Sequence, residues 1–158
     1  MVRFIIILFI RHKVIETIDL EVEKMKLIEA SRVSKEELEQ FLQNNNQIDI
    51  NTLLKSGYVV KCEGKIIGCF ELKLVDDGAF WLKQLYIIRN EAVKLPVLLE
   101  FILVFAKQKR AKVVFAHSEQ PVTDLLLESL SFSLHEDENF ELQKHKNRKG
   151  HWWAYEVS

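Results

Sequence analysis

The sequence predicts a soluble mixed α/β (α+β) fold with a mostly antiparallel sheet and a central parallel strand pair. Alternating hydrophobic residues and turn signals predict three consecutive antiparallel strands between residues 58 and 88. An apolar helix then separates the third strand from a further strand at 112–117, and such a crossover makes the two strands parallel. We expect the function to lie in the strand–helix–strand–helix run over residues 80–130.

Local signals predict the elements before this run. Residues 26–30 form a short strand, and Ser34 with Glu37 three residues later is typical of a capping box at a helix start. The asparagines at 44–46 end that helix, and a second helical turn follows at 50–54.

Two turns divide the antiparallel strands. Glu63-Gly64 joins strands at 58–62 and 65–75. Asp76-Asp77-Gly78 then leads into the third strand at 79–88.

The second half alternates helices and strands. A helix at 95–109 is apolar on most sides, which is typical of a covered crossover helix. After the strand at 112–117, Pro121 starts a second helix at a position where proline is tolerated. Short strands follow at 132–135 and 151–157.

Composition and charge exclude several classes of protein. The chain has 158 residues, 48% of them hydrophobic and 28% charged, which is ordinary for one globular domain and excludes a disordered chain. A net charge of −1 gives no global attraction to nucleic acid or anionic lipid.

An apolar run at residues 4–10 precedes the predicted domain, which we place at 25–158. The run is too short to span a membrane, because a spanning helix needs roughly 20 residues. Residues 1–24 are therefore an N-terminal extension or an extra strand, and the true start is Met1 or Met25.

The two cysteines, Cys62 and Cys69, fall in predicted strands. We expect buried, reduced thiols in a cytoplasmic protein, and no metal site. A nucleophilic cysteine acting with His117 is disfavoured, because reactive cysteines lie in exposed, electropositive places.

The parallel pair predicts a ligand opening beyond its carboxyl ends, after Ile88 and His117. Backbone N–H groups at the start of the Leu95 helix would attract a phosphate there, and Arg89 and Lys94 would add positive charge.

The order of elements from about residue 25 onward resembles the GCN5-related N-acetyltransferase (GNAT) family. The local match lies in Leu85-Tyr-Ile, Leu98-Leu-Glu-Phe-Ile, Ala111-Lys-Val-Val-Phe-Ala and the segment 120–132. In the family these are the cofactor strand, the helix after the pyrophosphate loop, the next strand and the following helix.

The resemblance implies an acyl-CoA N-acyltransferase-like fold with helices on both faces of the sheet. It implies acetyl-CoA as co-substrate, transfer of an acetyl group to an amine of a small molecule or a protein, and often a homodimer. The cofactor-binding residues that it implies are Leu85, Tyr86, Ile87, Arg89, Asn90, Val93, Lys94, Leu95 and Gln120.

The sequence departs from the family pattern at several positions. Val93 and Leu95 stand where the pyrophosphate loop usually has small residues, and Leu127 stands at the usual tyrosine acid. Gln120 replaces an asparagine at the helix start. A catalytically silent CoA-binding or protein-interaction module is therefore the alternative function.

Two residues are candidates for proton transfer. His117, at the exit of its strand, has the side-chain type of a base, or it is a structural strand-end histidine. Tyr86 is a candidate acid or a core residue. Trp81 on the same strand either lines an acceptor pocket or packs in the core. Phe80, Leu82 and Gln84 lie on the opposite face of that strand.

Charged segments offer two further alternatives. Asp76 and Asp77 attract a cationic amine or form a solvated turn. The basic cluster at 144–149 is a solvated hairpin loop, a contact for a CoA phosphate, or a nucleic-acid contact, and we prefer the first interpretation.

Overall fold

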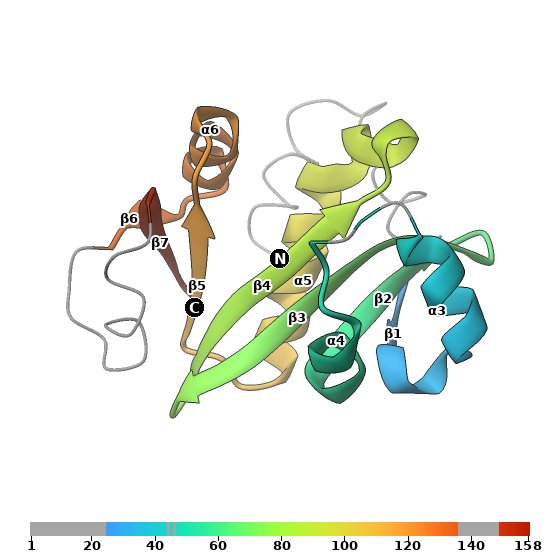
Figure 1. The fold of residues 1–158 in the computed structure, drawn as a ribbon. Helices are drawn as coiled ribbons and strands as arrows, with labels where there is room; N and C mark the ends of the chain where they lie inside the picture. Colours follow the sequence, from blue (N-terminus) through green and yellow to red (C-terminus); the bar gives the residue numbers. More distant parts are fainter. Residues whose placement is uncertain (1–24, 44, 46, 136–148) are drawn as a thin grey trace, which may run out of the picture. The chain divides into compact units, whose positions relative to one another are not determined.

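The computed structural model describes residues 25–43, 45, 47–135 and 149–158, so the apolar run at 4–10 and most of the basic cluster lie outside the described residues. The described strands form one sheet in the order β1-β2-β3-β4-β5-β7-β6 (Figure 1). They are β1 (Met25–Glu29), β2 (Gly57–Cys62), β3 (Lys65–Asp76), β4 (Ala79–Ile87), β5 (Val113–Ser118), β6 (Ser133–Leu134) and β7 (His151–Glu156).

The described helices are α3 (Lys35–Leu42), α4 (Ile50–Ser56), α5 (Leu95–Gln108) and α6 (Pro121–Ser129), with 3-10 turns η1 (Ala30–Arg32) and η2 (Arg89–Lys94). These elements confirm the predicted order. The β1–β2 and β2–β3 pairs are antiparallel, and β4 pairs with β5 in parallel, as the crossover requires.

The chain divides into two compact units. The first contains the described part of Met1–Leu72 together with Gln84–Phe101, and the second contains Lys73–Lys83 with Ile102–Ser158. Both β4 and α5 therefore contribute residues to each unit.

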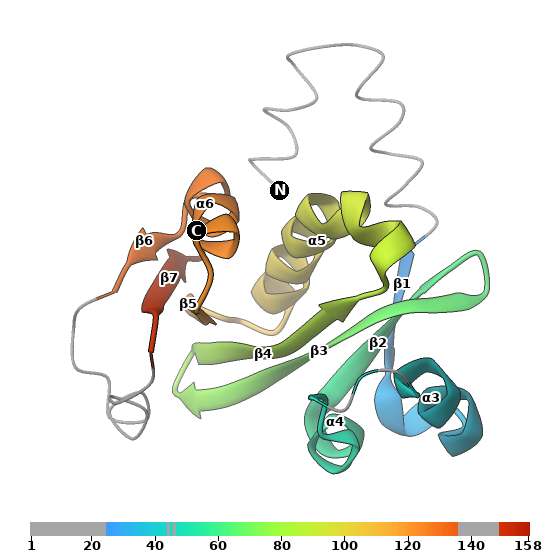
Figure 2. The ribbon, with the colours of Figure 1, turned by 45° about the horizontal axis from the view of Figure 1, so that its top comes forward.

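In the first unit, α3 and α4 lie on one face of the sheet and the start of α5 lies on the other, which confirms helices on both faces (Figures 1 and 2). Ser34 caps α3, because its side chain accepts a hydrogen bond from Glu37 N at 3.1 Å. The Glu37 carboxylate lies 3.0 Å from Lys61 Nζ and so ties α3 to β2.

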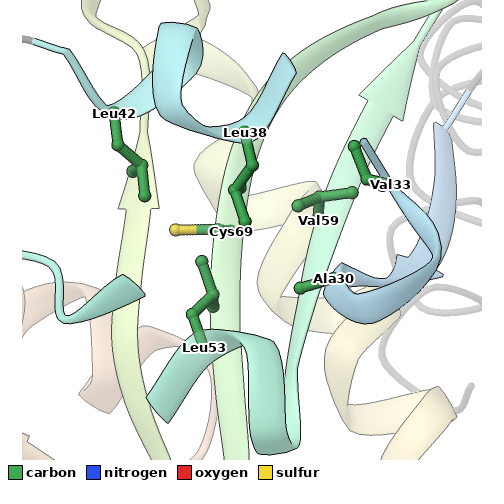
Figure 3. Packing of buried hydrophobic residues seen from close by; sticks show 7 residues of the cluster. All are labelled: Ala30, Val33, Leu38, Leu42, Leu53, Val59 and Cys69. Carbon is green, nitrogen blue, oxygen red and sulfur yellow. The ribbon is translucent and has the colours of Figure 1, made fainter. Parts of the chain in front are cut away.

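An apolar cluster holds α3 and α4 against the sheet of the first unit. Figure 3 shows Leu38 and Leu42 from α3 and Leu53 from α4 directed toward Val59 and Cys69 of the strands. All five residues are buried. Burial of this apolar face, rather than helix propensity, stabilises these short helices.

In the second unit, β7 lies between β5 and β6 and pairs antiparallel with both. The sequence does not predict this order, because it depends on pairing between residues far apart in the chain. Pro121 occupies the first turn of α6, as predicted. Among the helices of the described residues, none is long and apolar enough to cross a bilayer.

Candidate functional site

The segment after β4, where the sequence predicts a phosphate-binding loop, is helical. Residues Arg89–Lys94 form η2, which continues directly into α5, and the N–H of Leu95 donates to Ala92 O. The prediction that the Leu95 amide is available at a helix start is therefore wrong. The reason is local: residues 89–94 contain neither glycine nor proline, so the helical path begins earlier. No side chain caps the start of η2 at Ile88.

The side chains of η2 differ in their exposure and in their ion pairs. Lys94 Nζ lies 2.6 Å from Glu91 Oε2 and 3.8 Å from Cys62 Sγ, so its charge is already partly neutralised. Arg89 and Asn90 are exposed. Val93 is 86% exposed, so its bulk does not fill the interior of the first unit.

The carboxyl-terminal half of β4 is joined closely to β3. Ile88 N donates to Ile67 O at 2.8 Å, and a Cβ at Gly68 would lie 2.6 Å from Tyr86 O. The Tyr86 ring packs at 5.6 Å from Phe41 and belongs to the apolar cluster under α3 and α4. This placement matches the core alternative for Tyr86. Leu85 and Ile87 on either side of it are half-buried.

Gln84 breaks the regular path of β4. Its φ is +52°, a left-handed backbone that side-chain-bearing residues seldom adopt. The predicted alternation that places Gln84 with Phe80 and Leu82 therefore does not continue through it. Its side chain connects β4 to α4: Asp49 N donates to Gln84 Oε1 at 2.6 Å, and Gln84 Nε2 donates to Thr52 Oγ1 at 2.8 Å.

A buried carboxylate completes this network. Glu71 of β3 is 4% exposed. Its Oε2 accepts from Gln84 Nε2 at 3.0 Å, and its Oε1 accepts from Ser56 Oγ at 2.9 Å. Buried charges are usually paired with an opposite charge, whereas these two donors are neutral. The sequence offers one signal for the site, a glutamate between Phe70 and Leu72 in a strand.

The other candidate base lies in the second unit. His117 of β5 is half-buried, and its ring centroid lies 4.8 Å from that of Trp152. Trp152 in turn contacts the buried Trp81 at 5.0 Å, which supports the core alternative for Trp81. Asp77 is exposed in the turn before β4, as the solvated-turn alternative expects.

The start of α6 holds a polar cluster that the sequence analysis missed. Asp124 Oδ1 accepts from Trp153 Nε1 at 2.9 Å, and Asp124 Oδ2 lies 3.6 Å from His151 Nδ1. The hydrogen bond from Trp153 is the main cause that lowers the pKa of Asp124, and Ser118 and His151 lower it further. Gln120 is the exposed N-cap residue, and its N–H donates to Ser118 Oγ.

Solved structures share this arrangement of strands and helices. PseH, an N-acetyltransferase of Campylobacter jejuni, superposes with a TM-score of 0.64 at 15% identity, over 85% of this chain and 99% of PseH. A GNAT-family acetyltransferase from Staphylococcus aureus gives a TM-score of 0.64 at 16% identity, over 85% and 99% of the two chains.

The chain has the fold of GNAT acetyltransferases. N-acetylglutamate synthase from Neisseria gonorrhoeae, solved with coenzyme A and L-arginine, also superposes with a TM-score of 0.64 at 13% identity, over 84% of this chain and 33% of the synthase. No protein-family model and no curated protein matches the sequence.

Leu127, which the sequence resemblance aligns with the family's usual tyrosine, lies in α6 and is buried. The side chains of Leu127 and Tyr86 therefore both face packed interiors. Arg89 and Asn90 before α5, Gln120 before α6 and His151 at the start of β7 are exposed polar residues.

Burial also predicts how the cysteines of this GNAT fold react. Desolvation raises the pKa of Cys69 to about 12, so about one thiol in 10,000 is ionised at pH 8. In a Cys62→Ser variant, we expect Ellman's reagent to modify native Cys69 at least about 100-fold more slowly than the unfolded chain. Fast stoichiometric modification of the native variant would contradict a buried thiol.

Proposed function

We propose that the chain is an acetyl-CoA-dependent N-acyltransferase that transfers an acetyl group to an amine of a small molecule or a protein. The observation that supports this most strongly is the fold that it shares with PseH over nearly the whole of that enzyme. A second structure of PseH, solved with acetyl coenzyme A, has the same fold and superposes with a TM-score of 0.62. Residues 25–158 would then form a single GNAT-like domain.

In the proposed reaction the nitrogen lone pair of the acceptor attacks the thioester carbonyl carbon. The C–N bond forms, the C–S bond breaks and CoA leaves as a thiol. Backbone N–H groups of Leu85, Tyr86 and Ile87 would polarise the carbonyl oxygen, as stabilisation of a developing oxyanion requires. Close pairing of this part of β4 with β3 at Gly68 would keep those groups in place.

The diphosphate of the cofactor would bind at the segment that follows β4. Arg89 and Asn90 are exposed at its uncapped start and supply a charge and a polar group. The backbone of Val93 is a further proposed contact, whereas the N–H of Leu95 already donates to Ala92 O. A contact from Gln120, in the second unit, stays a prediction of the sequence. Lys94 would have to exchange its ion pair with Glu91 for a phosphate.

The test combines thiol release from acetyl-CoA across a panel of amines with calorimetric titration of CoA. Arg89→Ala should weaken CoA binding by about tenfold or more, because a hydrogen bond to a charged group contributes about 1.5–3 kcal/mol. Arg32→Ala is the matched control, since Arg32 is an exposed arginine of η1 paired with Glu29 at 3.3 Å. Equal affinities of the two variants would contradict the proposed diphosphate contact.

Three observations favour the second candidate, a catalytically silent CoA-binding module. Val93 and Leu95 replace the small residues of the loop, η2 is helical, and Lys94 is paired with Glu91. Such a module would bind CoA without turnover, and ligand at 100 times its dissociation constant would stabilise it by about 2.7 kcal/mol. If neither acetyl-CoA nor longer acyl-CoAs stabilise the chain, a protein-interaction role is favoured.

The acceptor amine, a homodimer and the candidates His117 and Tyr86 stay predictions. Size-exclusion chromatography with light scattering tests the homodimer. Acceptors that are turned over in the amine panel identify the substrate class.

A further inference from the structure

Three acceptor oxygens converge on one nitrogen of the first unit, the side-chain Nε2 of Gln84. Thr52 Oγ1 lies 2.8 Å from this nitrogen, Glu71 Oε2 lies 3.0 Å from it, and the backbone oxygen of Asp49 lies 3.5 Å from it. An amide nitrogen carries two hydrogens, so Gln84 cannot donate to all three oxygens at once. A primary ammonium group carries three. The position therefore matches the hydrogen-bonding capacity of an ammonium group better than that of an amide.

The surroundings of this position are also negatively charged. Glu71 is 4% exposed, and its second oxygen, Oε1, accepts from the neutral hydroxyl of Ser56 at 2.9 Å. Asp49 adds a second carboxylate, which caps the start of α4. In the part of the chain that the structure describes, neither carboxylate forms an ion pair. A buried carboxylate without a cation is costly to the fold, so a bound cation would relieve that cost.

The residues around the position reach solvent and border the proposed reaction site. Asp49 and Ser56 are exposed at the two ends of α4, and Gln84 is half-buried. Gln84 also directly precedes Leu85–Ile87, the residues proposed to polarise the carbonyl oxygen. All of these residues belong to the first unit. A cation bound to Glu71 would therefore lie beside the residue at which the polarising segment begins.

We propose that the oxygens around Gln84 Nε2 bind a primary ammonium group of a ligand, with the carboxylate of Glu71 as its counter-ion. The ligand nitrogen takes the place of Gln84 Nε2 when the Gln84 side chain rotates away. The inference rests on the proposed function, in which this ligand is the acceptor. An ammonium nitrogen has no lone pair and cannot attack a thioester, so the group held by Glu71 is a second amino group. The acceptor is then a molecule with two amino groups.

The first experiment is calorimetric titration of the full chain with the diamine putrescine, at constant ionic strength and without acetyl-CoA. Glu71→Gln keeps the size of the side chain and removes its charge, so it should weaken binding by about tenfold or more. Glu39→Gln is the matched control, since Glu39 is a 56% exposed glutamate of α3 in the same unit. Its affinity should stay within about twofold of wild type. Equal affinities of the two variants would contradict an ammonium site at Glu71.

A second variant opens the site. Gln84→Gly removes the amide that occupies the position, keeps the three oxygens and adopts the φ of +52° without strain. It should bind putrescine about threefold or more tightly than wild type, because no side chain has to be displaced first. Weaker binding by this variant would contradict the site. Far-UV circular dichroism shows which variants are folded, and if Glu71→Gln is not, the affinity of Gln84→Gly decides.

Turnover separates this inference from the proposed function. An active chain should have a kcat/KM for putrescine about tenfold or more above that for butylamine, which has the same carbon chain and one amino group. Glu71→Gln should abolish this preference. If it lowers kcat/KM equally for both amines, Glu71 acts on the reacting nitrogen, and the second-amine site is contradicted. If the chain neither binds nor turns over acetyl-CoA, the proposed function fails, and the putrescine titrations still decide whether Glu71 binds an ammonium group.

Discussion

Replacing Leu53 by alanine should lower the free energy of unfolding by about 2–5 kcal/mol, the range for removal of a buried leucine side chain. Leu53 is 0% exposed, and it is directed from α4 into the cluster that also contains Leu38 and Cys69 (Figure 3). Because α4 has only seven residues, it has little stability of its own without this contact.

The measurement is urea unfolding followed by far-UV circular dichroism. Tryptophan fluorescence is a poorer readout for Leu53, since Trp81, Trp152 and Trp153 all belong to the second unit. Leu125→Ala is the matched control, because Leu125 is 67% exposed on α6 and its loss should change stability by less than about 0.5 kcal/mol. Equal effects of the two substitutions would contradict the packing of α4.

Replacing Gln84 by alanine should destabilise the chain by about 1.5–3 kcal/mol, because it removes a hydrogen bond to a buried carboxylate. The lost donor is Gln84 Nε2, 3.0 Å from Glu71 Oε2. Water cannot readily replace it, since Glu71 is buried. The substitution also removes the bonds that connect β4 to Asp49 and Thr52 of the α4 start.

A glycine at the same position is the matched comparison. Gln84→Gly loses the same side chain but adopts the left-handed φ without strain, so it should be more stable than Gln84→Ala by about 1 kcal/mol. This order is the reverse of the usual one in a strand, where glycine is the weaker residue. If alanine were the more stable of the two, the left-handed backbone at Gln84 would be contradicted.

The helix starts and turns that the sequence predicted correctly depend on residues that are close together in the chain. Ser34 caps α3 through an N–H only three residues away. Gly64 and Gly78 adopt the positive φ values that turns require, and Pro121 occupies the first turn of α6. Each of these preferences acts within one turn, so the residue types alone reveal it.

The polar clusters were not predictable in the same way. Gln84 contacts Asp49, which is 35 residues away, and Trp153 contacts Asp124 across 29 residues. Neither pair has a spacing or motif that marks it in the sequence. His117 became a candidate base because it is a histidine at the end of a predicted strand. The helical path of residues 89–94 was not predicted, because the family pattern has a pyrophosphate loop there.

The sequence by itself determined the order of helices and strands, the parallel crossover and the burial of both cysteines, because hydrophobic periodicity and turn chemistry are local. The tertiary structure alone decided that Glu71 lies buried against Gln84, that β7 enters between β5 and β6, and that His151 meets Asp124. These contacts form only after segments far apart in the chain have packed together. Each buried polar group then finds its hydrogen-bond partner on another segment, which local sequence does not reveal.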